Sequence, residues 1–88
     1  MSDDDAFARK FAELGEQFRA ELPARLAEIR AHLAAGEFDE VRAIAHRLAG
    51  RGGTFGAPGI TSAGRAVEEA DAAALPAAVA ALAAVIGG

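Results

Sequence analysis

The stretch FDEVRAIAHRLAGRGGTFG, residues 38–56, predicts a helix with one apolar face and a histidine on the opposite side. Successive residues of an α-helix are rotated by about 100°. At that rotation His46 lies roughly 150° from the centre of the apolar arc. The side that carries the histidine holds small or acidic residues, namely Asp39, Ala43, Gly50 and Gly53. The arc expected to face a core consists of Phe38, Val41, Ile44, Ala45, Leu48 and Phe55.

Several glycines follow the histidine at positions where a helix is expected. Gly50, Gly52 and Gly53 each cost a helix interior up to about 1 kcal/mol relative to alanine. That cost is large against the stability of a small domain, so a requirement other than local helix stability favours them. Because Ala43, Gly50 and Gly53 share the face of His46, we expect the surface of a partner protein to approach the imidazole there.

Apolar residues at steps of three or four predict one long helix over residues 5–35. The steps continue without a shift across Pro23, which favours one helix over two. The proline predicts a kink, because it removes the hydrogen bond to the carbonyl of Arg19. Ser2 suits the cap of this helix and Gly36 suits its end. The apolar stripe consists of Phe7, Phe11, Leu14, Phe18, Leu22, Leu26, Ile29 and Leu33.

Three shorter helices are expected after the first. The second runs from Glu37 to about Thr54 or Phe55 and carries His46. Pro58 fits the first turn of the third, and Pro76 starts the fourth. The expected inward residues are Ile60, Ala63, Val67 and Ala70 in the third helix and Val79, Leu82 and Ile86 in the fourth. The sequence therefore predicts an all-α, up-down antiparallel four-helix bundle, with residues 1–88 as a single domain and all five phenylalanines at core positions.

Composition argues against several classes of function. The formal net charge of −4 makes a nucleic-acid partner unfavourable, since binding to phosphates requires a basic surface. The chain has no cysteine and therefore no disulfide or thiolate metal site. Residues 1–5 lack the features of a signal peptide, and no apolar run reaches the roughly 20 residues of a membrane helix, so we expect a cytoplasmic protein. His32 has no glycines around it and is expected to be an ordinary surface residue, and no metal site is expected.

Residues 45–58, AHRLAGRGGTFGAP, and the later Ala66-Val67-Glu68 resemble the histidine-containing phosphotransfer (HPt) domain. The signature of that family is Ala-His, a variable residue, Leu, usually Lys and then Gly. A small-residue stretch and an aromatic or aliphatic residue before Gly follow. The resemblance extends from about Phe7 to Ile86. The chain departs from the pattern at two positions, because Ala49 stands where Lys is usual and Arg51 where a small residue is usual.

The resemblance implies a phosphocarrier, and not an enzyme with an ATP-dependent kinase activity of its own. In such domains a phosphoryl group passes from the aspartyl phosphate of a receiver domain to the histidine, here His46, and then to another receiver's aspartate. Imidazole, with an ordinary pKa of about 6.5, is a neutral nucleophile near pH 7. The implied partners are receiver domains of response regulators and hybrid histidine kinases in a multistep two-component phosphorelay. We expect a monomer without a cofactor of its own, to which the receiver brings Mg²⁺.

Arg47 and Arg51 are the cations expected to stabilise the phosphoryl group on His46, because nearby positive charge favours phosphoryl transfer. In the family, the Lys at the position of Ala49 lies beside the phosphorylated ring. Arg51, whose planar guanidinium can bind a phosphoryl group through two hydrogen bonds, is expected to substitute for it. A hydrogen bond on the second ring nitrogen is expected to fix the tautomer, and the sequence does not identify its partner.

Two other functions stay open at this point. A docking module of the same fold would bind receiver domains without carrying phosphate, and the alanine at position 49 is compatible with that role. A dimeric histidine-kinase phosphoacceptor bundle fits less well. In that family the histidine precedes an acidic residue and a proline-containing turn, whereas His46 is followed by Arg47-Leu48-Ala49-Gly50.

Overall fold

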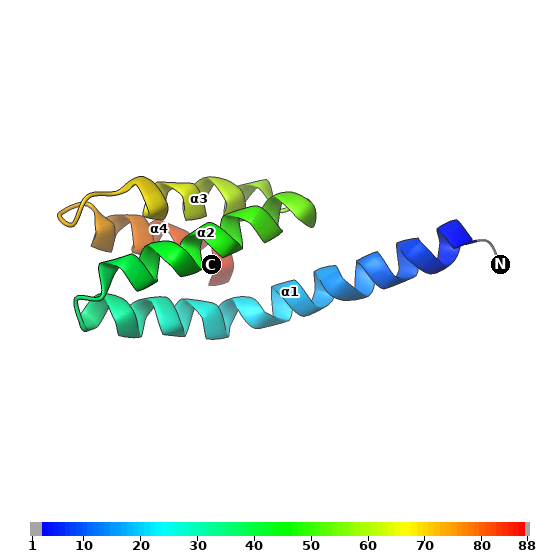
Figure 1. Ribbon diagram of the computed structural model, residues 1–88, viewed down its shortest axis with the longest axis horizontal. Helices are drawn as coiled ribbons and strands as arrows, with labels where there is room; N and C mark the ends of the chain where they lie inside the picture. Colours follow the sequence, from blue (N-terminus) through cyan, green and yellow to red (C-terminus); the bar gives the residue numbers. More distant parts are fainter. Residues whose placement is uncertain (1–2, 88) are drawn as a thin grey trace.

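The computed structural model describes residues 3–87, and within them the chain forms four α-helices and no strand. The helices are α1 (Asp3–Ala34), α2 (Phe38–Thr54), α3 (Pro58–Glu69) and α4 (Leu75–Gly87). Figure 1 shows consecutive helices running in opposite directions, which confirms the predicted up-down antiparallel bundle. α1 and α3 each pack against both α2 and α4. Within residues 3–87, none of the helices has the length and apolar character needed to cross a membrane.

The helix ends follow from glycines, a proline and an aspartate. Gly36 and Gly56, which end the turns after α1 and α2, have φ values of +75° and +67°. This left-handed backbone is accessible to glycine without strain. Pro58 occupies the first turn of α3, as predicted. Before α4, the carboxylate of Asp71 accepts a hydrogen bond of 2.9 Å from the backbone N–H of Ala74. Ser2, the expected cap of α1, lies outside the described residues.

α1 is one continuous helix through Pro23, as the unbroken apolar pattern predicts. Figure 1 shows that α1 changes direction in its middle third, which contains the proline, in agreement with the expected kink. The C-terminal half of α1 packs along the bundle. Its N-terminal half extends beyond the other helices (Figure 1).

The apolar faces of all four helices meet in one core. In α2, α3 and α4, the residues expected to point inward are buried or half-buried, which confirms the arcs predicted for these helices. The residues that form the core cluster are Phe18, Leu22, Ile29, Val41, Ile44, Ala45, Leu48, Ile60, Val67, Leu75, Val79 and Leu82.

The first part of the apolar stripe in α1 is not buried, and here the prediction of core positions was wrong. Phe7 is 72% exposed, Phe11 40% and Leu14 39%. The 32 residues of α1 span about 48 Å, whereas the 17 residues of α2 span about 26 Å, so the shorter helices end before they can cover this segment. The ring of Phe11 still lies 5.2 Å from that of Phe55, which in turn lies 5.5 Å from the buried ring of Phe18.

Glycines allow α2 and α3 to approach closely. A Cβ atom on Gly64 would lie 3.0 Å from the carbonyl oxygen of Ala45 and 3.1 Å from the Cβ of Ala49. A Cβ atom on Gly52 would lie 2.9 Å from Oγ1 of Thr61. That hydroxyl donates a hydrogen bond of 2.9 Å to the carbonyl oxygen of Ala49. α2 and α3 are therefore close enough for side chains at the exposed edges of the two helices to contact each other.

Candidate functional site

His46 lies in the middle of α2, and its side chain is 72% exposed. The exposure predicted for this residue is confirmed, since the apolar arc of α2 faces the core on the other side. Ala43 and Gly50, about one turn before and after it, are also exposed. A Cβ atom on Gly50 would have no heavy atom from elsewhere in the fold within 4 Å. The ring is thus open to approach by a second molecule.

Glu68 of α3 holds one nitrogen of the His46 ring. Its Oε2 lies 2.8 Å from Nδ1 of His46. An ionised carboxylate can accept a hydrogen bond but cannot donate one, so Nδ1 carries the proton in this contact. In the neutral imidazole, the lone pair available for reaction is then on Nε2. Glu68 is therefore the hydrogen-bond partner of the second ring nitrogen, which the sequence did not identify.

An open hollow of about 300 Å³ lies beside the ring, between α2 and α3. Ala49 and Gly50 contribute no long side chain to it, which leaves room for a small group next to His46. Glu68, Glu69 and Arg65 supply its charges. The lining residues are His46, Ala49, Gly50, Arg65, Glu68 and Glu69.

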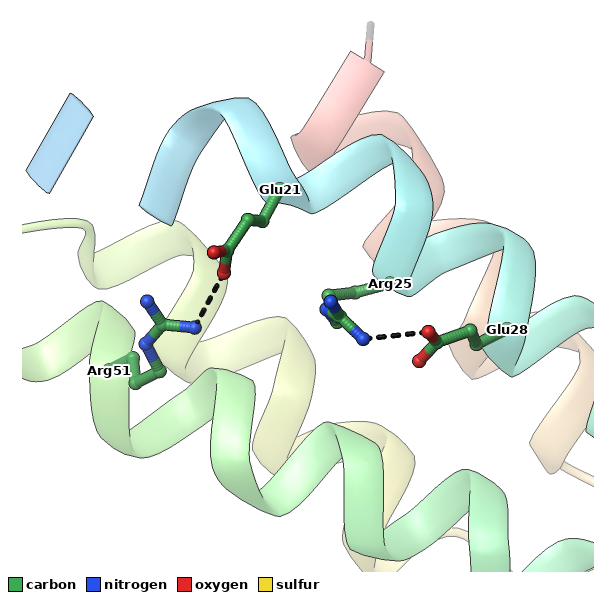
Figure 2. A network of polar contacts seen from close by, with 4 residues as sticks. All are labelled: Glu21, Arg25, Glu28 and Arg51. Carbon is green, nitrogen blue, oxygen red and sulfur yellow. Dashed lines mark hydrogen bonds and ion pairs between the residues drawn. The ribbon is translucent and has the colours of Figure 1, made fainter. Parts of the chain in front are cut away.

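Arg51, one of the two cations predicted for the site, is turned toward α1. Figure 2 shows its guanidinium facing Glu21, with Nη1 2.9 Å from Oε2 of that residue. The guanidinium also lies over the ring of Phe18, 4.9 Å from its centroid. Arg51 is not among the residues that line the hollow beside His46. Its observed contacts join α2 to α1, and the expected substitution for a lysine at Ala49 has no support in this arrangement.

Arg47, the other predicted cation, stays near the histidine. It lines a shallow surface depression together with Ala43, His46 and Glu68, on the side of the ring away from Gly50. Arg42 also lines this depression. Its guanidinium, however, donates a hydrogen bond of 3.0 Å to the carbonyl oxygen of Ala70 just after α3.

The glycines after His46 have different surroundings. Gly50 is open, as described above, whereas Gly52 is buried against α3. Gly53 is exposed, and a Cβ atom there would lie an ordinary 3.8 Å from Oγ1 of Thr61. Close helix packing therefore explains Gly52, while Gly50 and Gly53 belong to the exposed surface on which the docking face was predicted.

The second histidine belongs to a different part of the molecule. Nδ1 of His32, near the end of α1, lies 3.0 Å from Oε1 of Glu37 in the turn before α2. His46, in contrast, contacts Glu68 of α3. Residues 3–87 contain no group of three or more histidine or carboxylate side chains arranged to hold a metal ion.

The sequence interpretation missed Glu68 and Arg65 as site residues. Both lie on α3, 22 and 19 positions after His46, and their place at the site depends on how α2 and α3 pack. One feature of the sequence could have indicated that these two residues lie together. Glu68 and Arg65 are three residues apart, so they share a face of a helix whose apolar face is marked by Ile60 and Val67.

A family model, described as the Hpt domain, matches residues 13–87. The chain belongs to the Hpt domain family. Membership implies histidine phosphotransfer, and Hpt domains are phosphocarriers that interact with receiver domains. The matched range begins at residue 13 and so leaves out Phe7 and Phe11, in the part of α1 that extends past the bundle. No curated protein and no solved structure matched the sequence significantly.

Proposed function

We propose that this Hpt domain carries a phosphoryl group on Nε2 of His46 and relays it between aspartates of receiver domains in a multistep two-component phosphorelay. The observation that carries the proposal is the 2.8 Å contact between Nδ1 of His46 and Glu68 on an otherwise exposed ring. The exposed ring is accessible to a partner protein, and its contact with Glu68 orients it as a nucleophile.

The transfer step follows from this geometry. The lone pair of Nε2 attacks the phosphorus atom of an aspartyl phosphate, the Nε2–P bond forms, and the P–O bond breaks with its electron pair on the leaving carboxylate. The ring then bears positive charge, which the Glu68 carboxylate balances through the proton on Nδ1. Return transfer to a second receiver reverses these bond changes. The receiver brings the aspartate and Mg²⁺.

The receiver is proposed to dock over the face of α2 that contains Ala43, Gly50 and Gly53. All three are exposed, and Gly50 has open space above it. We also propose that the domain acts as a monomer. The large apolar side chains exposed in residues 3–87 are Phe7, Phe11, Leu14 and Val85. The other large apolar side chains of the described residues are buried or half-buried in the bundle, which supports a monomer.

Incubation with a phosphorylated receiver domain tests the proposal. We expect an acid-labile, alkali-stable phosphate on the wild-type chain and on His32→Gln, and none on His46→Gln. Labelling of His46→Gln at the wild-type level would contradict the assignment of the acceptor. A wild-type chain that binds receivers in a titration but never becomes labelled would favour a docking module instead.

A further inference from the structure

We propose that Arg65 is the cation that stabilises the phosphoryl group on His46. The inference rests on the proposed function and adds a residue to the same site. Arg65 lies on α3, three residues before Glu68, so both project from the same face of that helix. The juxtaposition of Arg65 with His46 around one hollow carries the proposal.

The charges around this hollow require a cation when the ring is phosphorylated. Glu68 and Glu69 line it, and a phosphoryl group on Nε2 would add further negative charge beside them. Glu68 is already in contact with Nδ1 of His46, at 2.8 Å. Arg65 is the one lysine or arginine among the residues that line the hollow. It is therefore the side chain placed to offset the added charge.

Arg65 is also available to bind. It is exposed and, within the part of the chain that the structure describes, it forms no ion pair or hydrogen bond through its guanidinium. Arg51 and Arg42, in contrast, are held by Glu21 and by the carbonyl oxygen of Ala70. A free guanidinium can donate two parallel hydrogen bonds to phosphoryl oxygens without breaking an existing pair.

The small residues of α2 give Arg65 its access. Ala49 and Gly50 form the α2 side of the hollow, and neither extends into the space between His46 and α3. Arg47 is the alternative cation, since it also has no ion pair among the described residues. It lies beside Ala43, in the depression on the other side of the ring. The two arginines can therefore be separated by mutation.

The test uses the full chain and phosphoramidate, a small phosphoryl donor that removes any effect on receiver docking. Nε2 attacks phosphorus, the P–N bond of the donor breaks and ammonia leaves. Phosphohistidine formation would be followed by ³¹P NMR in the wild type, Arg65→Ala, Arg65→Lys and Arg47→Ala. Arg25→Ala serves as a matched control, because Arg25 pairs with Glu28 on α1 (Figure 2) and lines neither of the two hollows beside His46.

We expect Arg65→Ala to lower the initial rate about tenfold, with an unchanged unfolding curve. Arg65→Lys should recover part of the loss, because lysine keeps the positive charge but cannot form the paired hydrogen bonds of a guanidinium. The wild-type rate should fall with added salt, and this dependence should weaken in Arg65→Ala, because salt screens the attraction between the guanidinium and the anionic donor. A merely structural role for Arg65 would not produce that change.

Three results would overturn the assignment. These are a wild-type rate in Arg65→Ala, a Lys variant as slow as the Ala variant, or a loss of rate in Arg47→Ala that Arg65→Ala does not share. In each of these cases His46 is still labelled, so the proposed function stands. A wild-type chain whose His46 is never labelled contradicts the proposed function itself, and the role of Arg65 with it.

Discussion

At the scale of single residues, the contact between Glu68 and Nδ1 of His46 leaves Nε2 as the ring nitrogen proposed to carry the phosphoryl group. In the wild-type domain, ¹⁵N NMR near pH 8 should show neutral His46 with its proton on Nδ1. Glu68→Ala should abolish this preference and lower the rate of phosphorylation about tenfold, because the ring would no longer be held in the tautomer that leaves Nε2 free to react. A wild-type ring protonated on Nε2 would contradict the geometry described here.

The acceptor itself is tested by His46→Gln. Because the side chain is exposed, the substitution should change the free energy of unfolding by less than about 0.5 kcal/mol while removing all phosphorylation. Urea unfolding and labelling by a receiver measure the two effects. His32→Gln is the control, since His32 contacts Glu37 in another part of the fold. Loss of labelling in the control alone would move the acceptor to His32.

The sequence was sufficient to predict that His46 is exposed, but not which residues surround it. Its exposure follows from one helical period, because the apolar arc of α2 lies opposite. Glu68 and Arg65 come from another helix, and Arg51 is drawn away by Glu21. These pairings depend on the rotation and separation of packed helices, which the spacing of residues within one helix does not determine.

At the scale of helices, α2 contains an exposed glycine, Gly50, and a glycine buried against α3, Gly52. Gly50→Leu should keep the domain as stable as the wild type, or raise its stability by up to about 1 kcal/mol, because glycine disfavours a helix and the site is open. It should nevertheless slow transfer from a receiver, because the leucine side chain would stand on the proposed docking face. Stopped-flow transfer and receiver-binding titrations measure this. Transfer at the wild-type rate would contradict the docking face.

Gly52→Ala should behave in the opposite way. Its Cβ atom would lie 2.9 Å from Oγ1 of Thr61 and 3.1 Å from the carbonyl oxygen of Ala57, so α2 and α3 must shift apart. We expect a loss of about 1–3 kcal/mol of stability, as for other overpacked sites. Urea unfolding measures the loss. A stability equal to that of the wild type would show that the two helices are less tightly packed than described here.

At the scale of the whole molecule, the difference in length between α1 and its neighbours determines what is buried. Apolar residues recur at helical spacing in α1 from Phe7 to Leu33, so periodicity alone predicts that every residue of this stripe is buried. Burial depends also on whether another helix lies opposite. The extent of the bundle follows from the lengths of the shorter helices, so the prediction was correct for Phe18 and wrong for Phe7 and Phe11.

Two alanine substitutions should reveal this difference. Phe18→Ala should cost about 3–5 kcal/mol, because Phe18 is fully buried and its removal leaves a cavity. Phe7→Ala should cost less than about 1 kcal/mol, because its side chain is 72% exposed. Urea unfolding of both variants provides the comparison. A large loss of stability in Phe7→Ala would mean that the N-terminal half of α1 is packed against another protein surface in solution.

The most direct test of the central claim is to locate the phosphoryl group on the phosphorylated domain. After transfer from a phosphorylated receiver, ³¹P and ¹⁵N NMR should show a single phosphohistidine at His46, bonded through Nε2, with Nδ1 still protonated. A phosphoryl group on Nδ1 of His46 or on His32 would contradict the account, as would a receiver-bound domain that carries no phosphohistidine.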